Sequence, residues 1–241
     1  QVGSVTAQLK TSRHSDTPQI DTPHSRRRVS LADYEFADLI DQQDKVRLLI
    51  DPTSSYAQAA AMAMGRAMDD VIIAAATGTA YTGETGATSE SVQTAIAASV
   101  GTGTGLNLVK LTTAKRLLDD ADVDPSIPRH IIVGPEQLQN LLAVEQVTSS
   151  DYNTVKALVQ GEIDSYLGFK FTVSNRLAKS GNDRTCIVYA EDGITLGIGK
   201  DISARIDERA DKSYATQVYY CQSIGATRME SAKVVPITCT E

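Results

Sequence analysis

The stretch VGTGTGLN at residues 100–107 spaces three glycines two residues apart. Glycine-rich segments of this kind can bring backbone N–H groups close to a phosphate at the beginning of a helix. Known phosphate loops follow the patterns G-x-G-x-x-G or G-x-x-x-x-G-K-[ST]. Gly101, Gly103 and Gly105 instead give G-x-G-x-G, and no Gly-Lys-Ser/Thr follows. The sequence therefore predicts a flexible connector here and no nucleotide site.

A second candidate site is a run of acidic residues, since Asp120, Asp122 and Asp124 match the first three ligand positions of a calcium loop. However, Pro125 stands where that loop needs a glycine, and Ile131 stands where it needs a bidentate glutamate. Acidic side chains in a solvated turn at a helix end account for the run. We therefore predict no calcium site and no metal.

The other residues with metal-binding or nucleophilic chemistry are scattered, at His14, His24, His130, Cys186, Cys221 and Cys239. The histidines lack the H-E-x-x-H spacing and the cysteines form no C-x-x-C pair, so no zinc site is predicted. The nucleophile motif G-x-S-x-G is also absent. Three cysteines, an odd number, indicate free thiols and folding in a reducing cytoplasm. We predict no catalytic residue and no cofactor, although catalytic groups can meet in space without a sequence motif.

Charge divides the chain into two parts. The net charge is −7 and the sequence pI is about 5.0, which argues against a broad phosphate-binding surface. Residues 1–28 nevertheless carry a charge of +3, which leaves −10 for the remainder. The charged residues of this first segment are Lys10, Arg13, Asp16, Asp21, Arg26, Arg27 and Arg28. The sequence thus predicts a basic extension on an acidic body.

This extension reads as a long hairpin or arm. Val5, Ala7 and Leu9 alternate as on a strand edge, and Pro18 and Pro23 interrupt the middle. Such an element buries too little apolar surface to offset the entropy lost when it is ordered, so it needs a partner surface. A flexible, solvated tail is the alternative interpretation.

An acidic run follows the arm, at Asp33, Glu35, Asp38, Asp41 and Asp44. A solvated face explains this run by itself. The run and the basic arm are also complementary if identical copies of the chain meet. On this hypothesis the candidates for contacts between copies are Lys10, Arg13, Asp16, Arg26, Arg27, Arg28, Asp33 and Glu35.

The stretch YAQAAAMAMGRAMDDVIIAAATG at residues 56–78 predicts a helix that is buried on more than one side. Asp51 and Pro52 are typical of a helix start and Gly78 of a helix end, so the helix spans residues 52–77, about 39 Å at 1.5 Å per residue. This length is close to the whole diameter of a compact chain of this size. The helix is therefore predicted to be a spine of the fold.

Three charges lie in the middle of this helix, and they argue against a membrane span because each would be costly in lipid. Arg66 precedes Asp69 and Asp70 by three and four residues. This spacing allows ion pairs within the helix, each contributing a few tenths of a kcal/mol. Local pairing is the interpretation we favour, with contacts to a neighbouring copy as the alternative.

The rest of the chain predicts an α+β protein, because helices and a strand are followed by a strand-rich final third. The dipeptide Asp192-Gly193 is typical of a tight hairpin turn between two of these strands. The expected elements are a strand in 30–42, a short helical piece at 90–99, a helix at 108–121, a strand at 129–133, a helix at 135–144 and five short β runs after 166.

Three phrases, AAAMAMGRAMDDVIIAAATG, VTSSDYNTVKALVQGEIDSYLGFKFTVSNRL and YAEDGITLGIGKDISARIDERADKSYATQV, resemble the major capsid proteins of tailed bacteriophages with the Hong Kong 97 fold. The resemblance implies an extended loop at 1–30, a peripheral domain at 31–104 and 196–241 that contains the spine helix, and an axial domain at 105–195. The first residue is Gln1 and not Met, so we expect the true N-terminus to lie upstream. The N-terminal arm that the family places before the extended loop has no counterpart in this sequence, and it is expected to be either cleaved or outside the sequence.

The implied function is structural: many copies assemble as hexamers and pentamers into an icosahedral shell that encloses double-stranded DNA. The implied partners are scaffolding, decoration and portal proteins, and the implied place is the virion, assembled in the bacterial cytoplasm. Some family members cross-link lysine to asparagine, but Lys10 is the only lysine of the arm, and we predict no cross-link. The alternatives are an encapsulin-like compartment and a soluble α+β enzyme or binding module.

Overall fold

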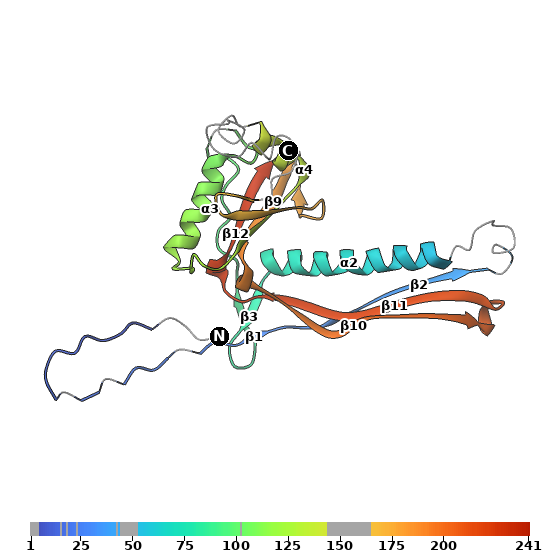
Figure 1. The fold of residues 1–241 in the computed structure, drawn as a ribbon, viewed down its shortest axis with the longest axis horizontal. Coiled ribbons are helices and arrows are strands. Elements are labelled where there is room, and N and C mark those ends of the chain that lie inside the picture. The colour runs from blue at the N-terminus through green and yellow to red at the C-terminus, as the bar shows by residue number, and fades with distance from the viewer. Residues whose placement is uncertain are drawn as a thin grey trace.

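The computed structural model describes residues 5–143 and 165–241, except residues 15, 18, 23, 42, 44–52 and 102. Figure 1 shows three parts. A compact unit carries the helices α3 and α4, a long sheet lies beneath the helix α2 and extends to one side, and a loop extends to the other side. No helix among the described residues combines the length and the apolar character that crossing a bilayer requires.

The long sheet has three antiparallel strands in the order β10 (Ile194–Arg209), β11 (Ala215–Arg228) and β2 (Ala32–Ile40). Side chains of β11 alternate between the two faces of the sheet. Val218, Gln222 and Ile224 lie on the face towards α2 and are almost completely buried. The Gln222 amide also donates to the backbone oxygen of Met64 in that helix, over 3.1 Å. One face of the sheet is therefore packed, and the other faces away from the helix.

The helix expected at residues 52–77 is observed as α2 (Thr53–Thr77), with its predicted Asp51 and Pro52 start outside the described residues. The buried residues of α2 lie on two sides of the helix. Ala60 and Met64 face the long sheet, whereas Ile73 and Ala76, about half a turn around the helix, belong to the core of the compact unit. The prediction of burial on more than one side is therefore confirmed for the second half of the helix. Met62, on the uncovered side, is 63% exposed.

The compact unit is built on a second sheet in the order β12 (Val234–Thr240), β9 (Asp183–Ala190), β5 (Arg129–Val133), β7 (Phe169–Val173) and β6 (Ser165–Tyr166), with β8 (Lys179–Ser180) paired to β9. The strands β5 and β7 are parallel. The helices α3 (Leu108–Asp120) and α4 (Pro135–Leu142) were expected at these places. Leu111, Leu118 and Leu141 from the helices join a core that includes Phe169 and Ile187 of the sheet.

The hairpin predicted at Asp192-Gly193 is not observed. The dipeptide Asp192-Gly193 lies in the 3-10 turn Glu191–Gly193, which leads from β9 to β10. These strands belong to different sheets, so the turn is no hairpin. The hairpin of β10 and β11 turns instead after the 3-10 segment Ala210–Lys212, where Ser213 and Tyr214 have positive φ angles.

The connector and the C-terminal strand also differ from expectation. The short strands β3 (Ala80–Thr82) and β4 (Thr88–Glu90) precede an extended segment, and no helix forms at 90–99. The reason is that Ile96 bridges to Ile237 and exchanges backbone hydrogen bonds with β12. The strand β12 itself pairs with β9. Residues 234–240 therefore lie in the sheet of the compact unit, apart from the other strands after residue 196.

The long sheet, α2 and a small sheet of β1 (Arg27–Arg28), β3 and β4 meet at Arg228, whose side chain is completely buried at the end of β11. One guanidinium nitrogen donates to the backbone oxygens of Ala76 (3.1 Å) and Gly78 (2.7 Å), and the other to that of Glu90 (2.9 Å). The last carbonyls of a helix lack partners within the helix and carry partial negative charge. Arg228 thus caps the C-terminus of α2 and joins it to β4 and β11.

We expect Arg228→Met to lower the free energy of unfolding by about 3 kcal/mol, because it leaves buried carbonyl groups without donors. Denaturant unfolding followed by circular dichroism measures this change. The matched control is Arg116→Met, since Arg116 forms an exposed ion pair with Asp120. Its effect should stay within about 0.5 kcal/mol. Equal effects of both substitutions would contradict the capping role.

Candidate functional site

Residues 5–26 form a loop that leaves the body and returns to it at β1 (Arg27–Arg28) (Figure 1). The predicted strand alternation at Val5, Ala7 and Leu9 produces no ladder, and the first strand of the described residues begins at Arg27. A two-stranded hairpin with no packed face is marginal in water, which explains the difference. Leu9 is 89% exposed, so its side chain makes little contact with the described part of the chain. We call residues 5–28 the arm, and its end at β1 the arm root.

The arm ends at a firmly held root. Arg27 pairs with Thr82 of β3, and Arg28 pairs with Tyr81. The Arg27 guanidinium forms an ion pair with Glu90 over 2.8 Å, and its Nε donates to the Met229 backbone oxygen. Since its side chain is only 10% exposed, Arg27 acts within the subunit.

Glu90 is also held from the other side, because the Ser231 hydroxyl donates to its carboxylate over 2.6 Å. Burial opposes ionisation of Glu90. The hydrogen bond from Ser231 and the charge of Arg27 outweigh this effect and hold the pKa of Glu90 below its usual value. The root is therefore an ionised cluster at neutral pH. The other basic residues of the arm, Lys10, Arg13, Arg26 and Arg28, are exposed, as is Asp16.

Three residues of the predicted acidic run, Asp33, Glu35 and Asp38, lie on β2, at an edge of the long sheet, and Asp41 follows that strand. Asp33 and Glu35 oppose Ser223 and Cys221 of β11, which places them on the face away from α2. Tyr219 donates to Glu35 over 3.0 Å, and this hydrogen bond raises the pKa of Tyr219 to about 12. Asp33 and Glu35 are exposed, whereas Asp44 lies outside the described residues.

A groove of about 380 Å³ lies on the opposite side of β2, against the helix. Its walls are mostly small or apolar, with two polar side chains: Ser30, Ala32, Tyr34, Asp70, Val71, Ala74, Ala75, Ile224, Gly225 and Ala226. The beginning of β2 therefore separates an acidic face from an apolar groove.

The charges in the middle of α2 do not pair as predicted. Asp70 forms a two-pronged ion pair with Arg176, which follows the sheet strand β7, 106 residues away. The hydrogen bonds from Arg176 lower the pKa of Asp70. Arg66 and Asp69 are exposed and form no ion pair within the described part of the chain. Asp70 thus links α2 to the compact unit. The spacing of charges along the helix does not predict this long-range contact.

The glycine-rich connector is fixed by a buried lysine that sequence reasoning missed. The Lys110 ammonium donates to the backbone oxygens of Thr104 and Gly105 over 2.8 Å each, and to that of Thr238 over 3.1 Å. The backbone N–H of Lys110, the third residue of α3, donates to the side chain of the N-cap residue Asn107 over 2.9 Å. The helix start is therefore capped by the protein itself and offers no phosphate loop.

All three cysteines are free thiols. Cys186 and Cys239 are completely buried near Lys110. Cys221 accepts a hydrogen bond from Lys200 at 3.0 Å and shares one with the Ser203 hydroxyl at 3.1 Å. The bond from Lys200 lowers the pKa of Cys221. The aspartates at 120–124 belong to turn and helix contacts, and no group of metal-ligating side chains gathers in the described ranges.

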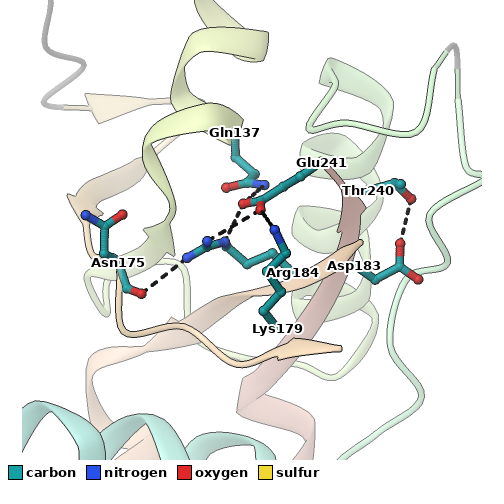
Figure 2. A network of polar contacts seen from close by, with 7 residues as sticks. All are labelled: Gln137, Asn175, Lys179, Asp183, Arg184, Thr240 and Glu241. Carbon is teal, nitrogen blue, oxygen red and sulfur yellow. Dashed lines mark hydrogen bonds and ion pairs between the residues drawn. The ribbon is translucent and has the colours of Figure 1, made fainter. Parts of the chain in front are cut away.

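Figure 2 shows the densest polar cluster, around Glu241. Its carboxylate pairs with Lys179 and Arg184 and accepts from the Gln137 amide over 3.2 Å. The hydrogen bonds from Lys179, Arg184 and Gln137 lower the pKa of Glu241 to about 2. A carboxylate that is ionised and saturated with donors is poorly suited to general acid or base catalysis. The cluster joins α4, β8 and β9 and is best explained as a structural contact.

The chain is similar to known proteins over its whole length. A family model described as phage capsid protein matches residues 1–241. A structure from Mycobacterium phage Che8 is similar, with a TM-score of 0.65 and 18% identity, covering 86% of this chain and 70% of that one. The capsid of cyanophage P-SCSP1u gives a TM-score of 0.71 and 14% identity, covering 98% and 80%. A search of curated protein sequences finds no match.

A more distant structure, a virus-like particle from Pyrococcus furiosus, has a TM-score of 0.53 and 14% identity, covering 87% of this chain and 76% of that one. At such low sequence identity, the structural similarity establishes the fold only. It confirms the predicted α+β architecture of the Hong Kong 97 type.

Arg26 and Arg27 are neighbours in sequence, but the structure gives them different roles. We expect Arg27→Met to lower the free energy of unfolding by about 2 kcal/mol, because it leaves Glu90 half-buried without its cation. Arg26→Met should change it by less than about 0.5 kcal/mol, since Arg26 is exposed. Thermal or denaturant melts of the two variants make the comparison, and a reversed order would refute the root contact.

Acid should weaken the Glu241 cluster. Its folded-state pKa is about 2, below the ordinary value of 4.5, so its contribution to stability is present above pH 4.5 and is lost as the pH falls through about 2. In Glu241→Gln this part of the pH dependence should disappear. Melting temperatures measured across this range test it, with exposed Glu84→Gln as the control that keeps the wild-type profile. A Glu241→Gln profile parallel to wild type would contradict the assignment.

Proposed function

Because the chain belongs to the phage capsid protein family and is a major capsid protein, a structural component of the shell, we propose that its copies form hexamers and pentamers of a closed icosahedral shell. On this proposal the subunit has no enzymatic activity and the shell encloses double-stranded DNA in the virion. Scaffolding, decoration and portal proteins are expected to act with it in the bacterial cytoplasm. Family membership favours this function over an encapsulin-like compartment or a soluble enzyme.

The arm is the observation that supports assembly most directly. It is held at its root by Arg27 and Glu90, yet its apolar side chains Val5, Leu9 and Ile20 are exposed, and Leu9 is 89% exposed. Ordering a long segment costs conformational entropy that its own contacts do not offset. The surface of a neighbouring copy provides the missing contacts.

Charge supports the same arrangement. The exposed side chains Lys10, Arg13, Arg26 and Arg28 project from the arm, and Asp33 and Glu35 are exposed on the body. We place the arm's cations near the carboxylates of an adjacent copy, where Arg can donate two parallel hydrogen bonds. Arg27 is not part of this contact, because its cation is neutralised by Glu90. The acidic body is compatible with containing DNA without gripping it.

Deletion of residues 1–25 should abolish shell formation while the body stays folded, because the deletion keeps the β1 contact at the arm root. Negative-stain microscopy should show shells tens of nanometres wide for the full chain and only monomers or small oligomers for the truncated one. Unchanged thermal melting shows that the body is intact. Normal closed shells from the truncated chain would remove the arm from the mechanism.

A further inference from the structure

The strand β2 is an edge of the long sheet, since it pairs only with β11 among the described strands. An edge presents backbone N–H and C=O groups that can accept a further strand. Peptide recognition often uses this mode, in which the backbone provides affinity and alternate side chains provide specificity. The question is which segment has side chains that fit both sides of β2.

Both sides of β2 are already defined at its beginning. Asp33 and Glu35 face away from the helix, and Ala32 and Tyr34 face the groove of about 380 Å³ against α2. An added strand with the pleat of β2 therefore needs apolar residues on the groove side and a basic or neutral residue on the other side. Asp70, the one charged residue in the groove, is already paired with Arg176.

Residues 5–10 of the arm have this pattern. Val5, Ala7 and Leu9 alternate with Thr6, Gln8 and Lys10. Val5 and Leu9 are exposed, and no strand forms here within the described chain. If the apolar set enters the groove, the pleat places Lys10 on the side of Asp33 and Glu35. The opposite orientation puts a lysine into the apolar groove and aliphatic side chains against carboxylates.

We propose that residues 5–10 of a second copy of the chain add to the free edge of β2, with Val5, Ala7 and Leu9 in the groove and Lys10 beside Asp33 and Glu35. The donor is a second copy because the arm of the same chain runs away from α2 and β2 (Figure 1). This inference rests on the proposed shell assembly and gives it a specific contact between subunits.

Cysteine pairs test the orientation of the pleat. In a Cys221→Ser background, which removes the least buried native thiol, Leu9→Cys is combined with Ala74→Cys in the groove. Shells exposed to mild copper-catalysed oxidation should then give a ladder of covalent oligomers on denaturing gels. The matched control combines Gln8→Cys with Ala74→Cys. It should give several-fold less cross-linking, because Gln8 lies on the other side of the strand.

The outcomes separate this contact from the general function. Closed shells without a Leu9–Ala74 ladder, or with an equal ladder from the Gln8 variant, would overturn the strand addition and leave shell assembly standing. A wild-type chain that forms no shells would overturn both. A cross-link that stays within one chain would show that the arm folds back on its own subunit, which also overturns the proposal.

A charge exchange covers the case in which the cysteine variants fail to assemble. Lys10→Glu and Asp33→Lys should each reduce the yield of shells several-fold in low salt, because each places like charges together. The double variant restores an opposite pair and should recover most of the yield. Failure of the double variant to exceed both single variants, with all three folded by circular dichroism, would refute the pairing.

Discussion

A buried arginine determines how the parts of this subunit are joined. Arg228 ends β11, and its guanidinium holds the last carbonyls of α2 together with that of Glu90 in β4. Three elements from distant parts of the chain converge on this one cation, which has no water to replace its partners. Burial lowers the pKa of Arg228, but an arginine remains charged in any accessible range. The guanidinium of Arg228 therefore keeps its charge and its hydrogen bonds across the accessible pH range.

The arm root depends on the same junction. Glu90 gives its backbone oxygen to Arg228 and its carboxylate to Arg27. The position of β4 thus fixes the place where the arm leaves the body. Because the arm is anchored at a defined point, it leaves the body in a fixed direction. Its exposed side chains can then contact a neighbouring copy. This arrangement suits a protein whose copies meet in a repeating geometry.

Local patterns in the sequence predict local structure well here. The apolar spacing of α2 and α3 and the strand at 129–133 follow from neighbouring residues, and these elements are observed within a few residues of their predicted ends. The segment 90–99 has helical spacing but forms a bridge to β12 instead, because tertiary pairing outweighs a weak local preference.

The contacts that organise the subunit could not be predicted in this way. Asp70 pairs with Arg176 and Arg27 contacts Met229, at separations of 106 and 202 residues. The sequence around Asp70 does not indicate whether it pairs with Arg66, four residues before it, or with a residue of the compact unit. Lys110 was also missed, because a lysine in an amphipathic helix normally faces solvent. The burial of Lys110 among backbone carbonyls depends on the tertiary fold, so the local sequence does not predict it.

The alanines of α2 have a consequence for how its uncovered side behaves when copies meet. Ala59 and Ala61 are exposed on either side of Met62 in the first half of the helix. An alanine has no rotamers to lose, so covering it removes apolar surface from water without the side-chain entropy cost that lysine or glutamate would bring. Their short side chains also leave no long groups that must be rearranged first. The spine therefore presents a surface that is already in its bound conformation, which favours repeated and correctable association of many identical subunits.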